Sequence, residues 1–208
     1  MNQTQVSRVL EELSRLYPEA GAELNFTNPF ETLVATILSA QCTDRRVNMV
    51  TGKLFRAYPD ARSLAKLTPE ELEPMIRECG LYHAKARNIV AACQALVERY
   101  DGRVPSTRKE LMALPGVGQK TAGVVLLAAF GDDQIPVDTH VFRVSRRIGL
   151  ADAATPEKVE EQLRVALPRE SWSHAHHLLI WHGRRCCAAR APKCGECPLA
   201  DGLCEKNL

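Results

Sequence analysis

One lysine of the chain stands in an unusual place, within the segment LPGVGQKTAGVV at residues 114–125. Gly116 and Gly118 allow the backbone to turn sharply and let amide groups approach another surface closely. The apolar run after Lys120 predicts a helix, whose unpaired N-terminal amides and dipole favour an anion. The segment therefore predicts a hairpin that binds a phosphodiester between two helices, although an ordinary helix-to-helix turn would use the same glycines.

Lys120 has two interpretations. Near a helix start, its positive charge meets the positive end of the helix dipole, where acidic residues are normally favoured. That field, together with partial burial, favours the neutral amine, which is a nucleophile. Local conflict of this kind is expected at functional sites. The alternative is a solvated lysine that extends outward or contacts a phosphate through its charge.

Asp138, in the segment IPVDTHVFRV, comes just after Pro136 and precedes another predicted helix. The ordinary role of an aspartate there is to cap the helix, because its side chain accepts bonds from the first amides. A capping carboxylate is held rigidly, and a rigid carboxylate opposite an amine can assist acid–base chemistry. The two roles are compatible.

The chain has eight cysteines, and five of them lie within its last two dozen residues: Cys186, Cys187, Cys194, Cys197 and Cys204. Where thiols stay reduced, such a group more often binds metal than forms disulfides. The last four follow the spacing C-x6-C-x2-C-x6-C, which has one close pair where structural zinc sites usually have two. Wide flanking loops suit a cubane iron–sulfur cluster. We interpret Cys42, Cys79 and Cys93 as small buried hydrophobic residues.

The composition predicts a globular protein. Its 208 residues, 45% hydrophobic and 25% charged, exclude a disordered or fibrous chain. The net charge of +2 does not identify a nucleic-acid partner, although a small balance can hide a basic face. The N-terminal segment has apolar residues at helical spacing rather than the continuous apolar run of a secretory signal. No segment has the run of about twenty apolar residues that a membrane span requires. We therefore expect a cytoplasmic protein.

Helix signals punctuate the chain. A cap residue, a proline and an acidic residue recur at three helix starts, Asn28, Thr68 and Thr155. In the first two, Glu31 and Glu71 are expected to bond back to the cap residue's amide. Gly80 and Gly149 stand where left-handed residues would end helices. Apolar residues recur at intervals of three and four, and no run alternates as strands do, so the sequence predicts an all-α fold.

The helices are expected to form two lobes. Residues 121–130, TAGVVLLAAF, are apolar all the way round, which predicts a central helix buried on every side. The break at residues 131–133 favours a helical-barrel domain at 23–132, which contains the hairpin. Residues 1–22 and 133–208 would form the second lobe, with the cysteine loop at 187–204. We expect a cleft between them, faced by Lys120 and Asp138.

Several motifs in the same order resemble one known family. They are the hairpin, the PVDTHVFRV segment, LSAQCTDRRVN at 38–48, GLYHAKARNI at 80–89 and HGRRCCAARAPKCGECPLADGLC at 182–204. Across nearly its whole length the chain resembles the endonuclease III family, in the helix-hairpin-helix, Gly/Pro-rich loop, Asp superfamily of DNA glycosylases. The resemblance implies a monomeric, nucleoid-associated base excision repair enzyme, a bifunctional DNA glycosylase and AP lyase. Its implied substrates are oxidised or ring-saturated pyrimidines and abasic sites in duplex DNA.

The resemblance also implies residue roles. Lys120 matches the nucleophile that attacks the sugar C1′ and forms a Schiff base, and Asp138 matches the carboxylate that assists. Gln41 and Leu81 match the residues that fill the gap left by a base turned out of the duplex. Without the resemblance, Leu81 would be an ordinary helix-end contact and Gln41 an ordinary polar residue. Further DNA contacts are expected at Gly116, Val117, Gly118, Gln119 and His140, the last of which also fits an ordinary helix residue.

The cysteine tail matches the family's four-iron four-sulfur cluster, with the ligands Cys187, Cys194, Cys197 and Cys204. The last interval has six residues where the family has five, and the turn at Asp201-Gly202 can absorb the extra residue. Cys186 is interpreted as a packing residue. Arg143, Arg146 and Arg147 are candidate phosphate contacts, although a solvated helix face explains them as well. We expect the cluster to stiffen a basic surface.

Two alternatives remain open. The adenine-mismatch glycosylase branch lacks the nucleophilic lysine, has a glutamate about where Thr36 stands, and carries an additional C-terminal domain, whereas this chain ends four residues after Cys204. In a non-catalytic DNA-binding module, Lys120 would add only charge. Borohydride capture of the protein on an abasic duplex would separate the enzyme from the first alternative, and loss of DNA nicking on Lys120→Ala would separate it from the second.

Overall fold

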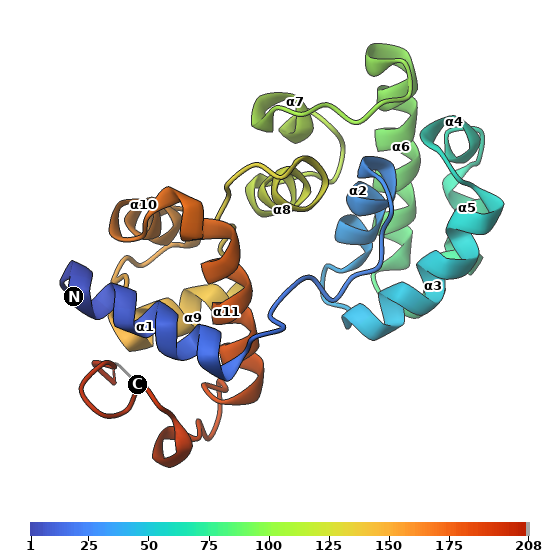
Figure 1. Cartoon of the computed structure of the whole chain (residues 1–208). Helices are drawn as coiled ribbons and strands as arrows, with labels where there is room; N and C mark the ends of the chain where they lie inside the picture. Colours follow the sequence, from blue (N-terminus) through green and yellow to red (C-terminus); the bar gives the residue numbers. More distant parts are fainter. Residues whose placement is uncertain (207–208) are drawn as a thin grey trace. The chain divides into compact units, whose positions relative to one another are not determined.

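The computed structural model describes residues 1–206, which are helical with no strand in that part of the chain (Figure 1). The predicted all-α fold is therefore confirmed. The chain divides into two compact units. We call Ala22–Asp132 the hairpin unit, and Met1–Gly21 with Asp133–Leu208 the terminal unit.

The hairpin unit is built around one long helix, α6. Its elements are α2 (Pro29–Leu38), α3 (Asp44–Ala57), α4 (Ala61–Leu64), α5 (Pro69–Ile76), the 3-10 turn η1 (Arg77–Cys79), α6 (Tyr82–Tyr100), α7 (Arg108–Met112) and α8 (Gln119–Phe130). Helices α4 and α5 pack against α6, and α2 packs against both α6 and α8. Leu33 and Leu38 of α2 and Ile89 and Leu96 of α6 are fully buried in the shared core.

Helix α8 is less buried than its composition predicts. Five of its residues are buried: Ala122, Gly123, Val125, Leu126 and Leu127. Val124 is half-buried and Phe130, at the end of the helix, is 37% exposed, so the expectation of burial on every side is wrong. Helix α8 therefore has more apolar residues than its buried face uses in contacts with the core.

The helix starts follow the predicted signals, with one difference. Thr68 forms the expected reciprocal capping box with Glu71 at the start of α5. At α2, Asn28 accepts a bond from the Glu31 amide, but the Glu31 carboxylate bonds to the amide of Thr27 instead of Asn28. The acidic side chain therefore closes the turn one residue earlier than predicted.

The helix ends also differ in one place. Gly149 has the left-handed conformation expected at the end of α9 (Thr139–Ile148), with φ +97° and ψ 19°. Gly80 has positive φ but an extended ψ of 162°, and the left-handed residue is Leu81. Helix α6 begins directly after Leu81. The turn between η1 and α6 therefore uses two residues with positive φ, where the sequence predicted a single left-handed glycine.

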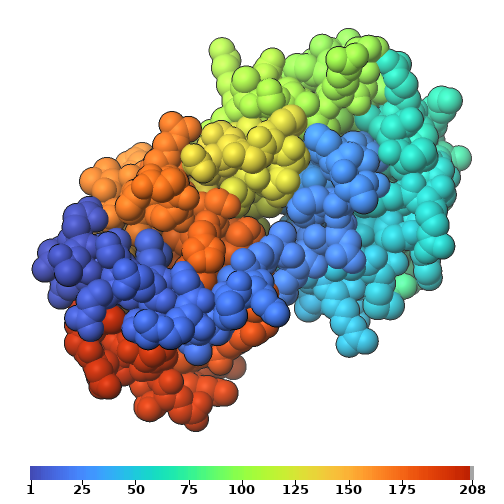
Figure 2. All heavy atoms as spheres, viewed as in Figure 1, coloured from blue at the N-terminus to red at the C-terminus, as the bar shows by residue number. Residues whose placement is uncertain are grey.

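The terminal unit joins both ends of the chain. Its elements are α1 (Gln3–Leu16), α9, α10 (Pro156–Ala166), η2 (Arg169–Ser171), α11 (Trp172–Arg185) and η3 (Cys194–Glu196). Helix α11 packs against α9 and α1. Leu13 of α1 and Leu199 and Leu203 near the C-terminus lie in one core. The space-filling view shows α1 in blue beside residues 186–204 in red, which we call the cysteine segment (Figure 2).

Within residues 1–206, no helix combines the length and apolar character that crossing a membrane requires. The longest helix, α6, has polar and charged residues along its length and belongs to the core of the hairpin unit.

Candidate functional site

The hairpin between α7 and α8 is anchored by two apolar side chains. Leu114 and Val117 are buried, and the Val117 amide donates to the Leu114 carbonyl at 3.2 Å. Gly116 has φ +76°, and a Cβ there would lie 2.7 Å from Cβ of Asn88. Gly118 has an extended backbone, and a Cβ there would meet no atom within 4 Å. Gly116 is therefore required by the fold, whereas Gly118 leaves space over the hairpin.

Val117 was expected among the DNA contacts. Its side chain is buried in the core of the hairpin unit and its amide bonds to the Leu114 carbonyl, so the residue anchors the hairpin. The motif pattern alone did not distinguish an anchoring residue from a contacting one.

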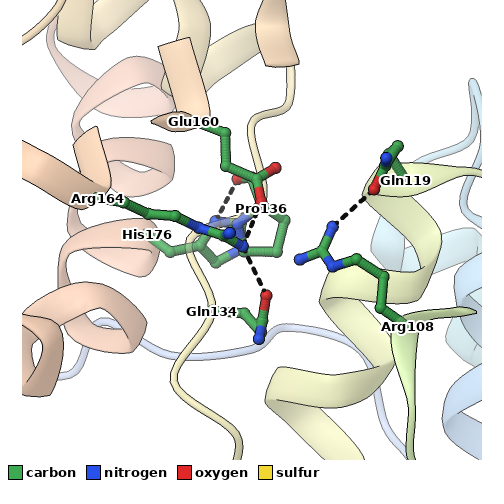
Figure 3. A network of polar contacts seen from close by, with 7 residues as sticks. All are labelled: Arg108, Gln119, Gln134, Pro136, Glu160, Arg164 and His176. Atoms are coloured by element: carbon green, nitrogen blue, oxygen red, sulfur yellow. Dashed lines mark hydrogen bonds and ion pairs between the residues drawn. The ribbon is translucent and has the colours of Figure 1, made fainter. Parts of the chain in front are cut away.

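Lys120 is the second residue of α8 and is exposed. The expected partial burial of Lys120 is therefore wrong. Gly118 precedes the helix and has no side chain to cap the first amides, which remain suited to an anion. Gln119 accepts a bond from the Arg108 guanidinium at 2.9 Å (Figure 3), which adds a second positive group near the helix start.

Asp138 is the N-cap of α9, as predicted. Its Oδ1 accepts from the amides of His140 and Val141, each at 2.8 Å. The carboxyl group is half-buried and its orientation is set by these two bonds. The rigid carboxylate that the sequence argument required is therefore present.

The segment that leads into Asp138 is held by two side chains that sequence analysis missed. His176, buried on α11, donates through Nδ1 to the Pro136 carbonyl at 2.9 Å (Figure 3). Arg164 of α10 donates to the Gln134 side chain at 2.9 Å. No local motif distinguishes these two residues from others in their helices. Their partners lie 40 and 30 residues away in the sequence.

His140 faces the C-terminal end of α11 rather than standing alone on α9. Its Nδ1 lies 3.3 Å from Nη2 of Arg143, and its β-carbon packs near Gly183. Burial is the main cause that lowers the pKa of His140, so the imidazole is biased toward its neutral form.

Two arginines of α9 bond to backbone carbonyls of distant segments. Arg143 donates to the carbonyls of Gly183 and Cys187, at 2.9 and 3.1 Å. Arg147 donates to the carbonyls of Ala188 and Ala189, at 2.7 and 3.2 Å. Both guanidinium groups therefore tie α9 to the end of α11 and the start of the cysteine segment, whereas their role as phosphate contacts stays a prediction.

Gln41 and Leu81 share an uncommon backbone conformation. Their φ angles are +52° and +48°, in the left-handed region that side chains with a Cβ rarely adopt. Both side chains are exposed, and Leu81 is 57% exposed. The interpretation of Leu81 as a helix-end packing contact is therefore wrong.

The cysteine segment surrounds one small pocket of the terminal unit. Its lining includes His182 and all five clustered cysteines: Cys186, Cys187, Cys194, Cys197 and Cys204. Donor atoms of His182, Cys186 and Cys197 lie within 4.8 Å of one another. Thiols gathered around one pocket form a donor set that suits a soft metal centre. Cys186 is buried, as expected of a packing residue, but it also lies among these donors.

The longer last interval of the cysteine motif is absorbed by a turn at residues 198–203. Gly202 has φ +81°, and Leu199 and Leu203 insert into the core on either side of the turn. The extra residue therefore leaves Cys197 and Cys204 facing the same pocket.

Residues 34–169 match the model of the HhH-GPD superfamily base excision DNA repair protein. Because this match covers more than half of the chain, the protein belongs to that superfamily. Its relatives define the group more closely. Endonuclease III of Synechocystis sp. is 49% identical over 195 residues, which are 93% of this chain and 89% of that protein. Endonuclease III of Escherichia coli strain K12 is 45% identical over 205 residues, 99% and 97% of the two chains.

A solved structure agrees with these relatives. A trapped covalent intermediate of endonuclease III with DNA is 47% identical and superposes with a TM-score of 0.94, covering 99% of this chain and 97% of that one. The chain therefore belongs to the endonuclease III family of bifunctional DNA glycosylases and AP lyases.

Proposed function

We propose that this enzyme excises oxidised or ring-saturated pyrimidines from duplex DNA and cuts the strand at the abasic sugar, with Lys120 as the nucleophile. The observation that carries the proposal is the exposed amine at the uncapped start of α8. It supports covalent chemistry because a relative of 47% identity forms a covalent intermediate with DNA. The family resemblance assigns the nucleophile to this lysine.

The proposed reaction breaks three bonds of the nucleotide. The neutral amine of Lys120 attacks the sugar C1′, the bond from C1′ to the base breaks, and the base leaves with a proton. The C1′–O4′ bond of the sugar then breaks, O4′ takes a proton, and the amine and C1′ become a protonated Schiff base. This Schiff base acidifies the C2′ hydrogen, and loss of that proton breaks the C3′–O bond by β-elimination, with the 3′ phosphate as the leaving group. Water then releases the enzyme. Asp138 assists by accepting and returning protons, for which its fixed Oδ1 orientation is suited.

A base stacked in a duplex must first be turned out, which costs a few kcal/mol. We assign Gln41 and Leu81 to the space that the base leaves. Their exposed side chains stand on left-handed backbone, which presents them outward from the hairpin unit. The amide of Gln41 can bond the orphaned partner base, and Leu81 can act as an apolar wedge.

The DNA backbone is expected to bind at the hairpin. The amides of Gly116, Gly118 and Gln119 offer donors to a phosphate, whereas the Val117 amide is bonded to the Leu114 carbonyl. The space above Gly118 allows a close approach. His140 lies at the start of α9, beside Asp138, and is a further candidate contact. Because one chain carries all the assigned groups, we expect a monomer. Since its proposed substrate is chromosomal DNA, we expect it to work at the nucleoid in the cytoplasm.

We also propose that Cys187, Cys194, Cys197 and Cys204 hold a four-iron four-sulfur cluster. The gathering of their thiols around one pocket supports this assignment. When bound, the cluster would cross-link the cysteine segment through four Fe–S bonds. Arg143 and Arg147 already fix the start of that segment to α9. Together with these two arginines, the cluster would form a rigid support for the basic residues Arg184, Arg190 and Lys193.

The first prediction tests the nucleophile on a duplex with one thymine glycol. Lys120→Ala should reduce strand incision to background and abolish capture by borohydride, because both need the amine, while DNA binding persists. The matched control is Lys109→Ala, which removes an exposed charge from α7 and should retain incision. Incision or covalent capture by Lys120→Ala would refute the proposed mechanism.

A further inference from the structure

Lys85, on α6, is the only buried lysine in residues 1–206, with 4% of its surface exposed. Lysines are rarely buried unless their charge is matched, because removing an ammonium from water is costly. The proposed chemistry does not use this residue, and sequence analysis did not single it out. Its burial therefore needs a separate physical explanation.

The ammonium of Lys85 joins two helix ends. Its Nζ donates to the carbonyl of Leu38, the last residue of α2, at 2.8 Å. It also donates to the carbonyl of Cys79, the last residue of η1, at 2.8 Å. Terminal carbonyls lack intrahelical partners and carry the negative end of the helix dipole, so a cation is well placed there.

Each of these carbonyls precedes a residue with strained backbone. Gln41 follows Leu38 by three residues, and Leu81 follows Cys79 by two. Both have left-handed φ angles and exposed side chains. Such conformations persist only when the surrounding structure holds them. The two bonds of Lys85 connect segments 47 and 6 residues away from it, and thereby link the two turns through one atom.

We propose that Lys85 is a positioning residue that fixes the spacing between Gln41 and Leu81, so that the two side chains enter the duplex together. This inference rests on the proposed roles of Gln41 and Leu81. A lysine suits the task because its compact ammonium can donate to two converging carbonyls, whereas the larger planar guanidinium of arginine has a fixed fork. The adjacent Cys79 thiol does not supply a counter-charge, since burial raises the pKa of Cys79 to about 12.

The test compares Lys85→Met, which keeps the volume and removes the donors, with the wild-type enzyme. Single-turnover excision of thymine glycol from a duplex should fall at least tenfold. Cleavage of an abasic site in single-stranded DNA should stay within twofold, because no base is turned out and no partner base is orphaned. Lys85→Gln, with a shorter side chain that retains an N–H donor, should show an intermediate loss and serves if Lys85→Met does not fold.

A matched control separates positioning from stability. Ile89→Ala also disturbs the buried face of α6 but leaves both carbonyl bonds in place. At a temperature where all variants are folded, it should retain duplex excision. A 2-aminopurine opposite the abasic site should brighten on binding wild-type protein and less on binding Lys85→Met, which reports the estranged base without any reaction.

A double-mutant comparison completes the test. In a Gln41→Ala, Leu81→Ala background, adding Lys85→Met should change duplex excision by less than twofold, because the residues act together. Equal losses on single-stranded and duplex DNA, or a full additional loss in that background, would overturn the inference. Failure of the proposed function is distinguishable, since it would appear as incision by Lys120→Ala, whatever Lys85→Met does.

Discussion

At the scale of single residues, Asp138 combines a helix cap with the chemical role that we propose for it. Its Oδ1 caps α9 through two amides, and these bonds fix the carboxylate that the proposed mechanism needs. An asparagine caps a helix about as well as an aspartate but cannot exchange a proton at neutral pH. The two roles can therefore be separated by substitution.

Asp138→Asn should leave the free energy of unfolding within about 0.5 kcal/mol of wild type, while incision falls by about 10²–10⁴-fold. Asp138→Ala should also lose about 1 kcal/mol of stability, because the cap is removed. Urea unfolding and single-turnover nicking measure the two effects. Thr155→Ala, which removes the cap of α10, should lose similar stability and keep incision. Wild-type incision by Asp138→Asn would contradict the assigned role.

The choice between Cys186 and Cys187 as a ligand is another matter of single residues. Both line the same pocket. The donor atoms of Cys186, His182 and Cys197 lie within 4.8 Å of one another, and this group does not include Cys187. The family spacing nevertheless assigns the ligand to Cys187.

Cys187→Ser should purify with much less iron and sulfide and without visible absorption near 400 nm, whereas Cys186→Ser should keep both. The reason is that a cubane cluster needs four thiolates and the fifth cysteine only packs beside them. Iron analysis and absorption spectra of the two purified variants measure this. The opposite pattern would show that Cys186 is the ligand, and stoichiometric zinc in wild type would remove the cluster assignment.

At the scale of elements, the hairpin uses its two glycines for different purposes. Gly116 provides a left-handed turn packed against Asn88, whereas Gly118 is extended and open. One glycine therefore belongs to the fold and the other to the surface proposed to meet the phosphate.

Gly116→Ala should destabilise the protein by about 2 kcal/mol or more, since alanine disfavours this φ by about 1–2 kcal/mol and would also press on Asn88. Gly118→Ala should stay within about 0.5 kcal/mol of wild type but weaken binding to an abasic-site analogue in duplex DNA. Denaturant unfolding and fluorescence anisotropy provide the two measurements. If Gly118→Ala binds as wild type does, the backbone does not approach a phosphate there.

Helix α9 connects two parts of the proposed chemistry within the terminal unit. Asp138 caps its first turn, and Arg143 and Arg147 hold the cysteine segment from later turns. The sequence offered three arginines on this helix as candidate phosphate contacts or as a solvated face. It did not indicate that two of them bond to backbone carbonyls, because a carbonyl partner 40 or more residues away is not visible in local spacing.

At the scale of the whole molecule, each unit has its own apolar core, and the terminal unit also buries histidines. Burial, followed by the nearby His174, lowers the pKa of His177. Folding therefore excludes a proton that the unfolded chain binds near pH 6.5. Stability contributed by the neutral imidazole is present above that pH and is lost as the pH falls through the window below it.

The unfolding free energy should therefore fall between pH 7.5 and pH 5.5, and it should fall less in His177→Gln. The difference between the two proteins should reach up to about 1 kcal/mol, because one unit of pKa shift corresponds to about 1.4 kcal/mol. Urea unfolding at both pH values measures it. Identical pH dependences in wild type and variant would show that His177 titrates alike in both states.

The sequence alone determined the features that depend on near neighbours. The helix starts at Thr68, Thr155 and Asp138, the left-handed Gly116 and Gly149, and the cysteine spacing are all set within one or two turns of chain. Capping and turn preferences act over that range, so a single sequence predicts them. The motifs that indicate the family are also short segments, so they can be read from the sequence alone.

Tertiary structure alone decided which groups meet across long stretches of chain. The exposure of Lys120, the two carbonyls bound by Lys85 and the bond from His176 to Pro136 depend on how helices pack. A side chain's type and spacing do not specify a partner 40 residues away, because many carbonyls are chemically equivalent until packing brings one of them within reach.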